Sequence, residues 1–156
     1  MGIKIEQDSL KRTLARLDAA EDAVGMATEE ALRSVGEYVV NQIRNGHMSN
    51  WLNDTGNLRS SVGFAVCKKG QIVSMSDFGT ILQGSEGAMK GKMLVQSLAS
   101  QYAHCDYTLI IVAGEEYAVY VEAVDNKIVL SSGWLYIKKV LPKVLRERVK
   151  QALQKI

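Results

Sequence analysis

The residues able to support chemistry are few in this sequence. It holds two histidines, His47 and His104, and the tightest group of reactive side chains is His104-Cys105-Asp106. Adjacent residues on a strand or turn point in different directions, so these three do not form a metal site, and no spaced set of Cys and His ligands is present. One alternative is that the protein is a cryptic hydrolase that uses Cys105 as nucleophile and a histidine distant in the sequence as base. No residue next to Cys105 or Cys67 indicates an activated thiol. Both thiols are expected to be structural and free in a reducing compartment.

Two further candidate motifs fail on inspection. The segment from Gly84 to Met93 is glycine-rich, but it lacks the first glycine and the hydroxyl of a phosphate-binding loop. Three carboxylates, Glu115, Glu116 and Glu122, would suit acid–base catalysis only if partnered, and unpartnered surface glutamates are much more common. We therefore expect no enzyme activity, no cofactor and no metal.

The elements that position these residues follow from periodicity. Apolar residues three or four apart predict one long amphipathic helix, or two, from Asp8 or Ser9 to Asn45-Gly46, with Gly25 as the place for a break. A polar loop follows over 47–57. Alternating residues then predict a β-hairpin over 62–75, turning at 68–70.

The second half of the chain is less regular. Four glycines between residues 79 and 91 predict a flexible excursion that leads into a short helix at 92–102, the whole excursion covering 79–101. Residues 107–113 form the clearest strand and, being apolar on both faces, are expected at the centre of the sheet. Residues 117–124 fit a strand or a short helix, and 127–130 a short strand. A final helix is expected to start at a cap on Ser131 or Ser132 and to bend or divide at Pro142.

Composition fits one soluble domain spanning residues 1–156, and the helices and strands predicted above make its fold class α+β. The chain has 47% hydrophobic and 23% charged residues, no apolar run long enough to cross a membrane, and no apolar leader in its first residues. We therefore expect a cytosolic protein with a long N-terminal helix and a basic C-terminal helix packed on a small, mostly antiparallel sheet.

The net charge of +2 hides a strong asymmetry. Residues 1–133 carry an excess of acidic groups, whereas residues 134–156 carry seven basic groups and one acidic group. The final helix is therefore basic and amphipathic. It admits three interpretations: a solvated face, a contact with an acidic partner, or a contact with phosphates. The basic groups that would form this surface are Lys138, Lys139, Lys143, Arg146, Arg148 and Lys150.

Two segments go beyond periodicity. The first is Asp54-Thr55-Gly56-Asn57-Leu58-Arg59-Ser60-Ser61-Val62, and the second is Tyr117-Ala118-Val119-Tyr120-Val121-Glu122. Together they resemble the paired signatures of the tail-completion (neck, or minor tail) proteins of long-tailed bacteriophages. The expected order of elements also agrees with that family. The departures are Ala123-Val124 after the glutamate, where the family has Gly-Thr, and a final helix without the Pro-Phe-Leu entry.

The resemblance implies a non-enzymatic α+β subunit that joins head to tail. Its partners would be phage connector and tail-tube proteins and further copies of itself in a ring, with at most weak proximity to DNA and no membrane. It would reside in the cytoplasm of the bacterial host during assembly and then in the virion. The residues that carry the resemblance, as structural or interface groups, are Thr55, Gly56, Leu58, Arg59, Ser61, Tyr117, Tyr120 and Glu122.

Physical reasoning assigns a local role to several of these matched residues. Thr55 or Asp54 would cap a helical turn, Gly56 would relax the backbone, and Leu58 would enter the core. Arg59 would stay at the surface and pair with Glu122. Two alternatives to the phage subunit remain: a small nucleic-acid-binding module that uses the final helix, and the cysteine hydrolase.

Overall fold

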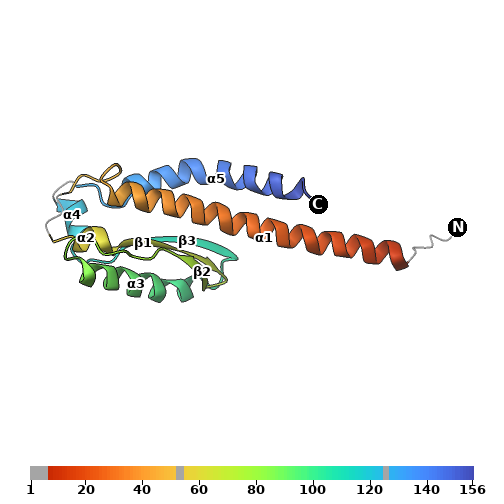
Figure 1. Ribbon diagram of the computed structural model, residues 1–156, viewed down its shortest axis with the longest axis horizontal. Coiled ribbons are helices and arrows are strands. Elements are labelled where there is room, and N and C mark those ends of the chain that lie inside the picture. Colours follow the sequence, from red (N-terminus) through yellow and green to blue (C-terminus); the bar gives the residue numbers. More distant parts are fainter. Residues whose placement is uncertain (1–6, 52–54, 125–126) are drawn as a thin grey trace.

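The computed structural model describes residues 7–51, 55–124 and 127–156 as an α+β fold. Its longest element is α1 (Gln7–Arg44), a 38-residue helix. The sheet has the strand order β2-β1-β3 and is antiparallel throughout. As Figure 1 shows, α1 lies over one face of the sheet and α3 over the other, and α5 runs along α1. The fold class predicted from the sequence is confirmed.

The hairpin is formed by β1 (Val62–Lys68) and β2 (Gln71–Met75), with Lys69 and Gly70 at positive φ in the turn. Alternate residues of β1 enter two different cores. Val62, Phe64 and Val66 face α1, whereas Ala65 and Cys67 face α3. Helices thus bury both faces of β1, which is why its alternation pairs large apolar residues with small ones rather than with polar ones.

The third strand, β3 (Tyr107–Ala113), pairs with β1 from Val62↔Ala113 to Lys68↔Tyr107. It was expected at the centre of the sheet because it is apolar on both faces, but it is an edge strand. Its apolar faces are explained by the helices above and below the sheet, because Leu109 and Ile111 pack toward α1 while Ile110 and Val112 pack toward α3. Two apolar faces on a strand indicate that helices cover both sides of the sheet. They do not indicate whether the strand is at the centre or at the edge.

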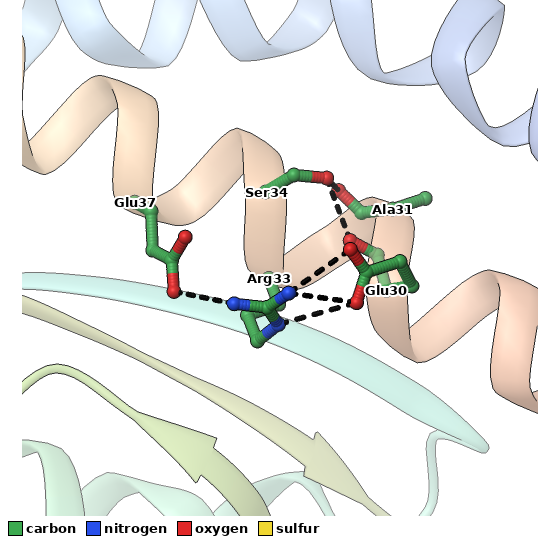
Figure 2. Close-up of polar contacts among 5 residues, drawn as sticks. All are labelled: Glu30, Ala31, Arg33, Ser34 and Glu37. Atoms are coloured by element: carbon green, nitrogen blue, oxygen red, sulfur yellow. Dashed lines mark hydrogen bonds and ion pairs between the residues drawn. The ribbon is translucent and has the colours of Figure 1, made fainter.

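Helix α1 is unbroken, so the alternative of two helices is wrong. Gly25 lies within it, and a Cβ there would come within 3.0 Å of the Tyr107 hydroxyl oxygen, so this glycine permits a close approach to the sheet. Farther along, Arg33 bridges Glu30 and Glu37, with its nearest nitrogen 2.8 Å from each carboxylate (Figure 2). These side chains are largely solvated, so the bridge supports the helix only slightly.

Helix α3 (Ser85–Ala99) starts earlier than the sequence suggested. The expected flexible segment extended to residue 91, but Gly87 and Gly91 are buried inside the helix. A short 3-10 turn, η1 (Ser100–Tyr102), follows it. The glycines indicate close packing against a neighbouring backbone here, not flexibility.

The last elements are α4 (Ala118–Val124) and α5 (Ser131–Leu153). Of the two alternatives for 117–124, the helix is therefore the correct one, and the strand expected at 127–130 does not form in the described part of that segment. Pro142 lies inside α5, which continues past it as one helix. No side chain at its N-terminal cap position bonds to its amides, and Ser132 instead donates its hydroxyl hydrogen to the Met48 carbonyl.

No helix within the described ranges combines the length and the apolar character that a membrane span requires.

Candidate functional site

The first matched segment folds into α2 (Asn57–Ser61), a single short turn that leads directly into β1. Gly56 sits at its N-terminal cap position with φ of 85°, in the left-handed region. A Cβ at Gly56 would lie 2.0 Å from the Ile81 carbonyl oxygen, so both backbone geometry and space require glycine. The exposed Thr55 accepts a hydrogen bond from the Asn57 amide at 3.3 Å, and Leu58 enters the core. Asp54, the other expected cap, lies outside the described residues.

Two buried serines fix this turn to the rest of the molecule. The Ser61 hydroxyl donates to the Leu58 carbonyl at 2.8 Å and accepts from the Glu115 amide at 3.3 Å. The Ser60 hydroxyl accepts from the Ile81 amide at 2.8 Å. Ser61 therefore links the first matched segment to the residues just before the second.

The turn also packs against α3 through a line of glycines. A Cβ at Gly87 would lie 2.0 Å from the Asn57 carbonyl oxygen, and one at Gly91 would lie 2.3 Å from the Ser61 carbonyl oxygen. The Asn57 side chain in turn accepts from the Gly87 amide at 3.3 Å. This contact was not predicted from the sequence, where its only signal is the spacing of four residues between the two glycines.

Glu115 is the second feature that was not predicted from the sequence. It was expected to be an unpartnered surface glutamate, but it is 4% exposed, and one of its carboxylate oxygens accepts from the Lys90 ammonium at 3.0 Å. Hydrogen bonds to Glu86 and Glu115 raise the pKa of Lys90. The second Glu115 carboxylate oxygen is buried without a hydrogen-bond partner among the described residues.

The second matched segment begins beside the first and continues through α4. Burial raises the pKa of Tyr117, and the neighbouring Glu115 carboxylate adds to that effect. Ala118 and Val121 pack into the core, as expected for Val121. The outward residues Tyr117, Val119 and Tyr120, which we call the α4 surface, are 43%, 76% and 60% exposed.

Glu122 does not pair with Arg59, so that prediction is wrong. The ion pairs within the described residues include neither of them. Instead the Glu122 carboxylate accepts from the Ser131 amide at 3.0 Å and from the Leu130 amide at 3.4 Å. It thereby caps the start of α5, where free amides and the helix dipole favour a negative charge. Burial opposes ionisation of Glu122, but the bonds from Ser131, Leu130 and Val129 outweigh it and lower its pKa.

Arg59 is half-buried rather than fully at the surface. Its guanidinium lies beside Gly46, just past the end of α1, and a Cβ at Gly46 would be 3.5 Å from its terminal nitrogen. Its Nε is buried without a hydrogen-bond partner among the described residues. The C-terminal end of α1 carries partial negative charge, which favours a guanidinium at this position.

The basic residues of α5 separate into three environments. Lys138 lies over the Trp134 ring, with its ammonium 5.8 Å from the centroid. Arg148 lines a groove against α1 together with Met26 and Glu30. The other four follow one another at spacings of four, three and four residues along the exposed side of α5. We call them the basic stripe: Lys139, Lys143, Arg146 and Lys150.

The cysteine chemistry finds little support in the geometry. Cys67 is fully buried and burial raises its pKa, while Cys105 is half-buried beside the hairpin turn. His47 follows α1 at the opposite end of the sheet, so only His104 lies near Cys105. Within the described residues, no group of three or more His, Cys, Asp or Glu side chains is placed to hold a metal ion.

Comparisons of this chain with protein-family models, with curated proteins and with solved structures found no match.

Proposed function

We propose that this chain is a non-enzymatic structural subunit of a tailed-phage particle, a tail-completion or head–tail joining protein. The proposal rests on the two matched segments and on the element order around them: a long helix, the Thr-Gly-x-Leu-Arg-x-Ser turn, a hairpin, a strand, the Tyr-Ala-x-Tyr-Val-Glu segment and a final helix.

The strongest support is that the matched residues fall into two groups: those that stabilise the fold and those that are exposed to solvent. Four of the matched residues stabilise the fold itself. Gly56 permits the left-handed backbone before α2, and Leu58 packs in the core. Ser61 fixes the α2 turn by hydrogen bonds, and Glu122 caps α5. The α4 surface presents Val119 and Tyr120 to solvent at one end of the molecule, together with the exposed part of Tyr117, which is otherwise partly buried (Figure 1). Tyrosine is enriched at protein–protein contacts because it combines large apolar area with a polar group. We assign the α4 surface to a neighbouring subunit of the particle.

Electron microscopy of the chain mixed with tail tubes tests this assignment. We expect added density, consistent with a ring, at one end of each tube. The variant Val119→Asp/Tyr120→Asp changes only exposed side chains and is expected to fold but to leave the tube ends bare. Tube ends without added density in the presence of the unaltered chain would contradict the proposal.

A nucleic-acid-binding module is the second candidate, and the basic stripe is the observation that favours it. Four exposed cations on one side of a helix form the kind of basic patch that contacts phosphates, and such binding is independent of sequence and weakens with salt. Within a joining protein the same stripe would lie near the DNA that passes from head to tail. A chain that binds no duplex at low salt would exclude this second function.

A further inference from the structure

The first four turns of α1 project beyond the rest of the molecule (Figure 1). We call residues 7–22 the arm. Every residue from 7 to 19 is exposed, including three leucines, Leu10, Leu14 and Leu17, which are 51%, 50% and 60% exposed. Up to residue 19 the arm therefore has no partner among the described elements of its own chain, and only at its end do Glu21 and Asp22 line a groove with Lys68 and Lys69 of the hairpin turn.

The three leucines form a single stripe. Their spacing of four and three residues places them on one side of the helix. The same spacing continues into the body of the protein, where Ala31, Leu32 and Val35 are buried on that side. The stripe is therefore the extension of a core-facing surface, and exposed leucines in this pattern are typical of a helix that packs on another helix.

The charges of the arm identify its partner. Residues 11–16 carry three basic groups, and residues 18–22 carry three acidic groups: Lys11, Arg12, Arg16, then Asp18, Glu21, Asp22. The remaining charge, Asp8, falls on the side of the helix away from the leucines. Two arms packed in parallel would place like charges side by side. Two arms packed antiparallel place each basic half against an acidic half, so the arm is complementary to itself in that orientation only.

We propose that the arm is a self-association site at which two copies of this chain pack antiparallel. Leu14 of each copy lies beside Leu17 of the other, and Leu10 lies over the stem of Glu21. In this register Lys11, which flanks the leucine stripe, comes beside Asp18 of the second copy, and the symmetry forms the pair twice. The basic stripe of α5 is a poorer partner, because it would repel Lys11, Arg12 and Arg16. The inference does not depend on the proposed function.

Sedimentation velocity over a range of concentrations tests the inference. A pair of four-turn helices buries less than the roughly 1,200 Å² of a standard interface, so we expect a weak dimer that increases with concentration. Leu14→Gln/Leu17→Gln is expected to abolish it. Both changes are at exposed positions, so the melting temperature and helix content should match those of the unaltered chain.

Charge reversal tests the orientation. Lys11→Asp and Asp18→Lys each place like charges together in the antiparallel dimer, and each is expected to weaken it at least tenfold. The double variant Lys11→Asp/Asp18→Lys restores the pairs and should recover the dimer, whereas a parallel dimer would gain nothing from the double change. Arg12→Asp, on the side away from the leucines, is the matched control and should change the affinity much less.

Three results would overturn the inference. The first is an unaltered chain that stays monomeric at every concentration. The second is a dimer that the leucine changes leave intact. The third is a dimer that is lost instead through Val149→Gln, which would locate the contact on α5.

Discussion

Glu122 illustrates how a matched residue contributes to this structure at the scale of single side chains. Its two carboxylate oxygens receive the Ser131 and Leu130 amides, and α5 starts at that point without a capping side chain of its own. A glutamate eight or nine residues before a helix thus replaces the usual serine or threonine cap.

This cap predicts an acid-dependent loss of stability. The pKa of Glu122 is lower in the folded protein than its ordinary value of 4.5. The stability contributed by the carboxylate is therefore fully present above that ordinary value and is lost as the pH falls through the folded one. We expect Glu122→Gln to lower the free energy of unfolding at pH 7 by about 1 kcal/mol. The difference should shrink below pH ~4.

Urea unfolding of both proteins at several pH values measures this effect. Glu116→Gln is the matched control, because the Glu116 side chain is exposed and accepts no hydrogen bond from α5. An equal loss in the two variants, or a loss for Glu122→Gln that does not change with pH, would show that Glu122 is not the cap of α5.

Between elements, α3 and α2 approach each other closely, and glycines make this approach possible. We expect Gly87→Ala to destabilise the protein by about 3 kcal/mol or more, since its Cβ would overlap the Asn57 carbonyl and the backbone would have to move. The same change in an ordinary helix interior would stabilise it by about 1 kcal/mol, so the sign of the effect is informative.

Gly79→Ala is the control for this contact. A Cβ at Gly79 would meet nothing closer than 3.7 Å. Thermal unfolding should show a large decrease in melting temperature for Gly87→Ala and little change for Gly79→Ala. A Gly87→Ala protein as stable as the unaltered chain would mean that α3 and α2 are farther apart than described.

The basic stripe belongs to the scale of one helix. If it contacts phosphates, Arg146→Glu should reduce the slope of log affinity against log salt by about 1, since each phosphate contact contributes about 0.9. Lys92→Glu changes the net charge equally, but on α3 at the other face of the sheet, and should leave the slope unchanged. If both variants reduce the slope equally, duplex binding depends on the net charge of the protein and not on the basic stripe.

The sequence predicted those elements whose pattern arises from local burial. The alternation of Val62, Phe64 and Val66 predicted the first strand of the hairpin, and apolar residues three or four positions apart predicted α1. The errors arose where a distant partner decides the structure. Gly87 and Gly91 indicated flexibility until their neighbour α2 was known, and the place of β3 in the sheet depends on which strands pair with it.

The candidate site divides in the same way. Leu58 and Val121 were predicted to face the core from their apolar character alone, and both do. The partners of Arg59 and Glu122 were not predictable, because nothing in the sequence distinguishes a helix end from an opposite charge as the group that a charged side chain meets.

For the whole molecule, the three surfaces to which we assign contacts lie at its two ends and along one side. Figure 1 places α4 at one end and the arm at the other, with α5, whose exposed side carries the basic stripe, lying along α1. Separate surfaces of this kind suit a subunit that contacts several neighbours at once, as our proposed head–tail joining protein must.

The proposed function predicts that a phage or prophage encodes the chain, and a joining assay with that phage is its most direct test. Particles assembled without it are expected to accumulate as separate heads and tails, and adding the purified chain should restore joined, infectious particles. The Val119→Asp/Tyr120→Asp variant should fail to restore them, while the exposed control Lys92→Glu should succeed. Heads and tails that join equally well without the chain would contradict the account.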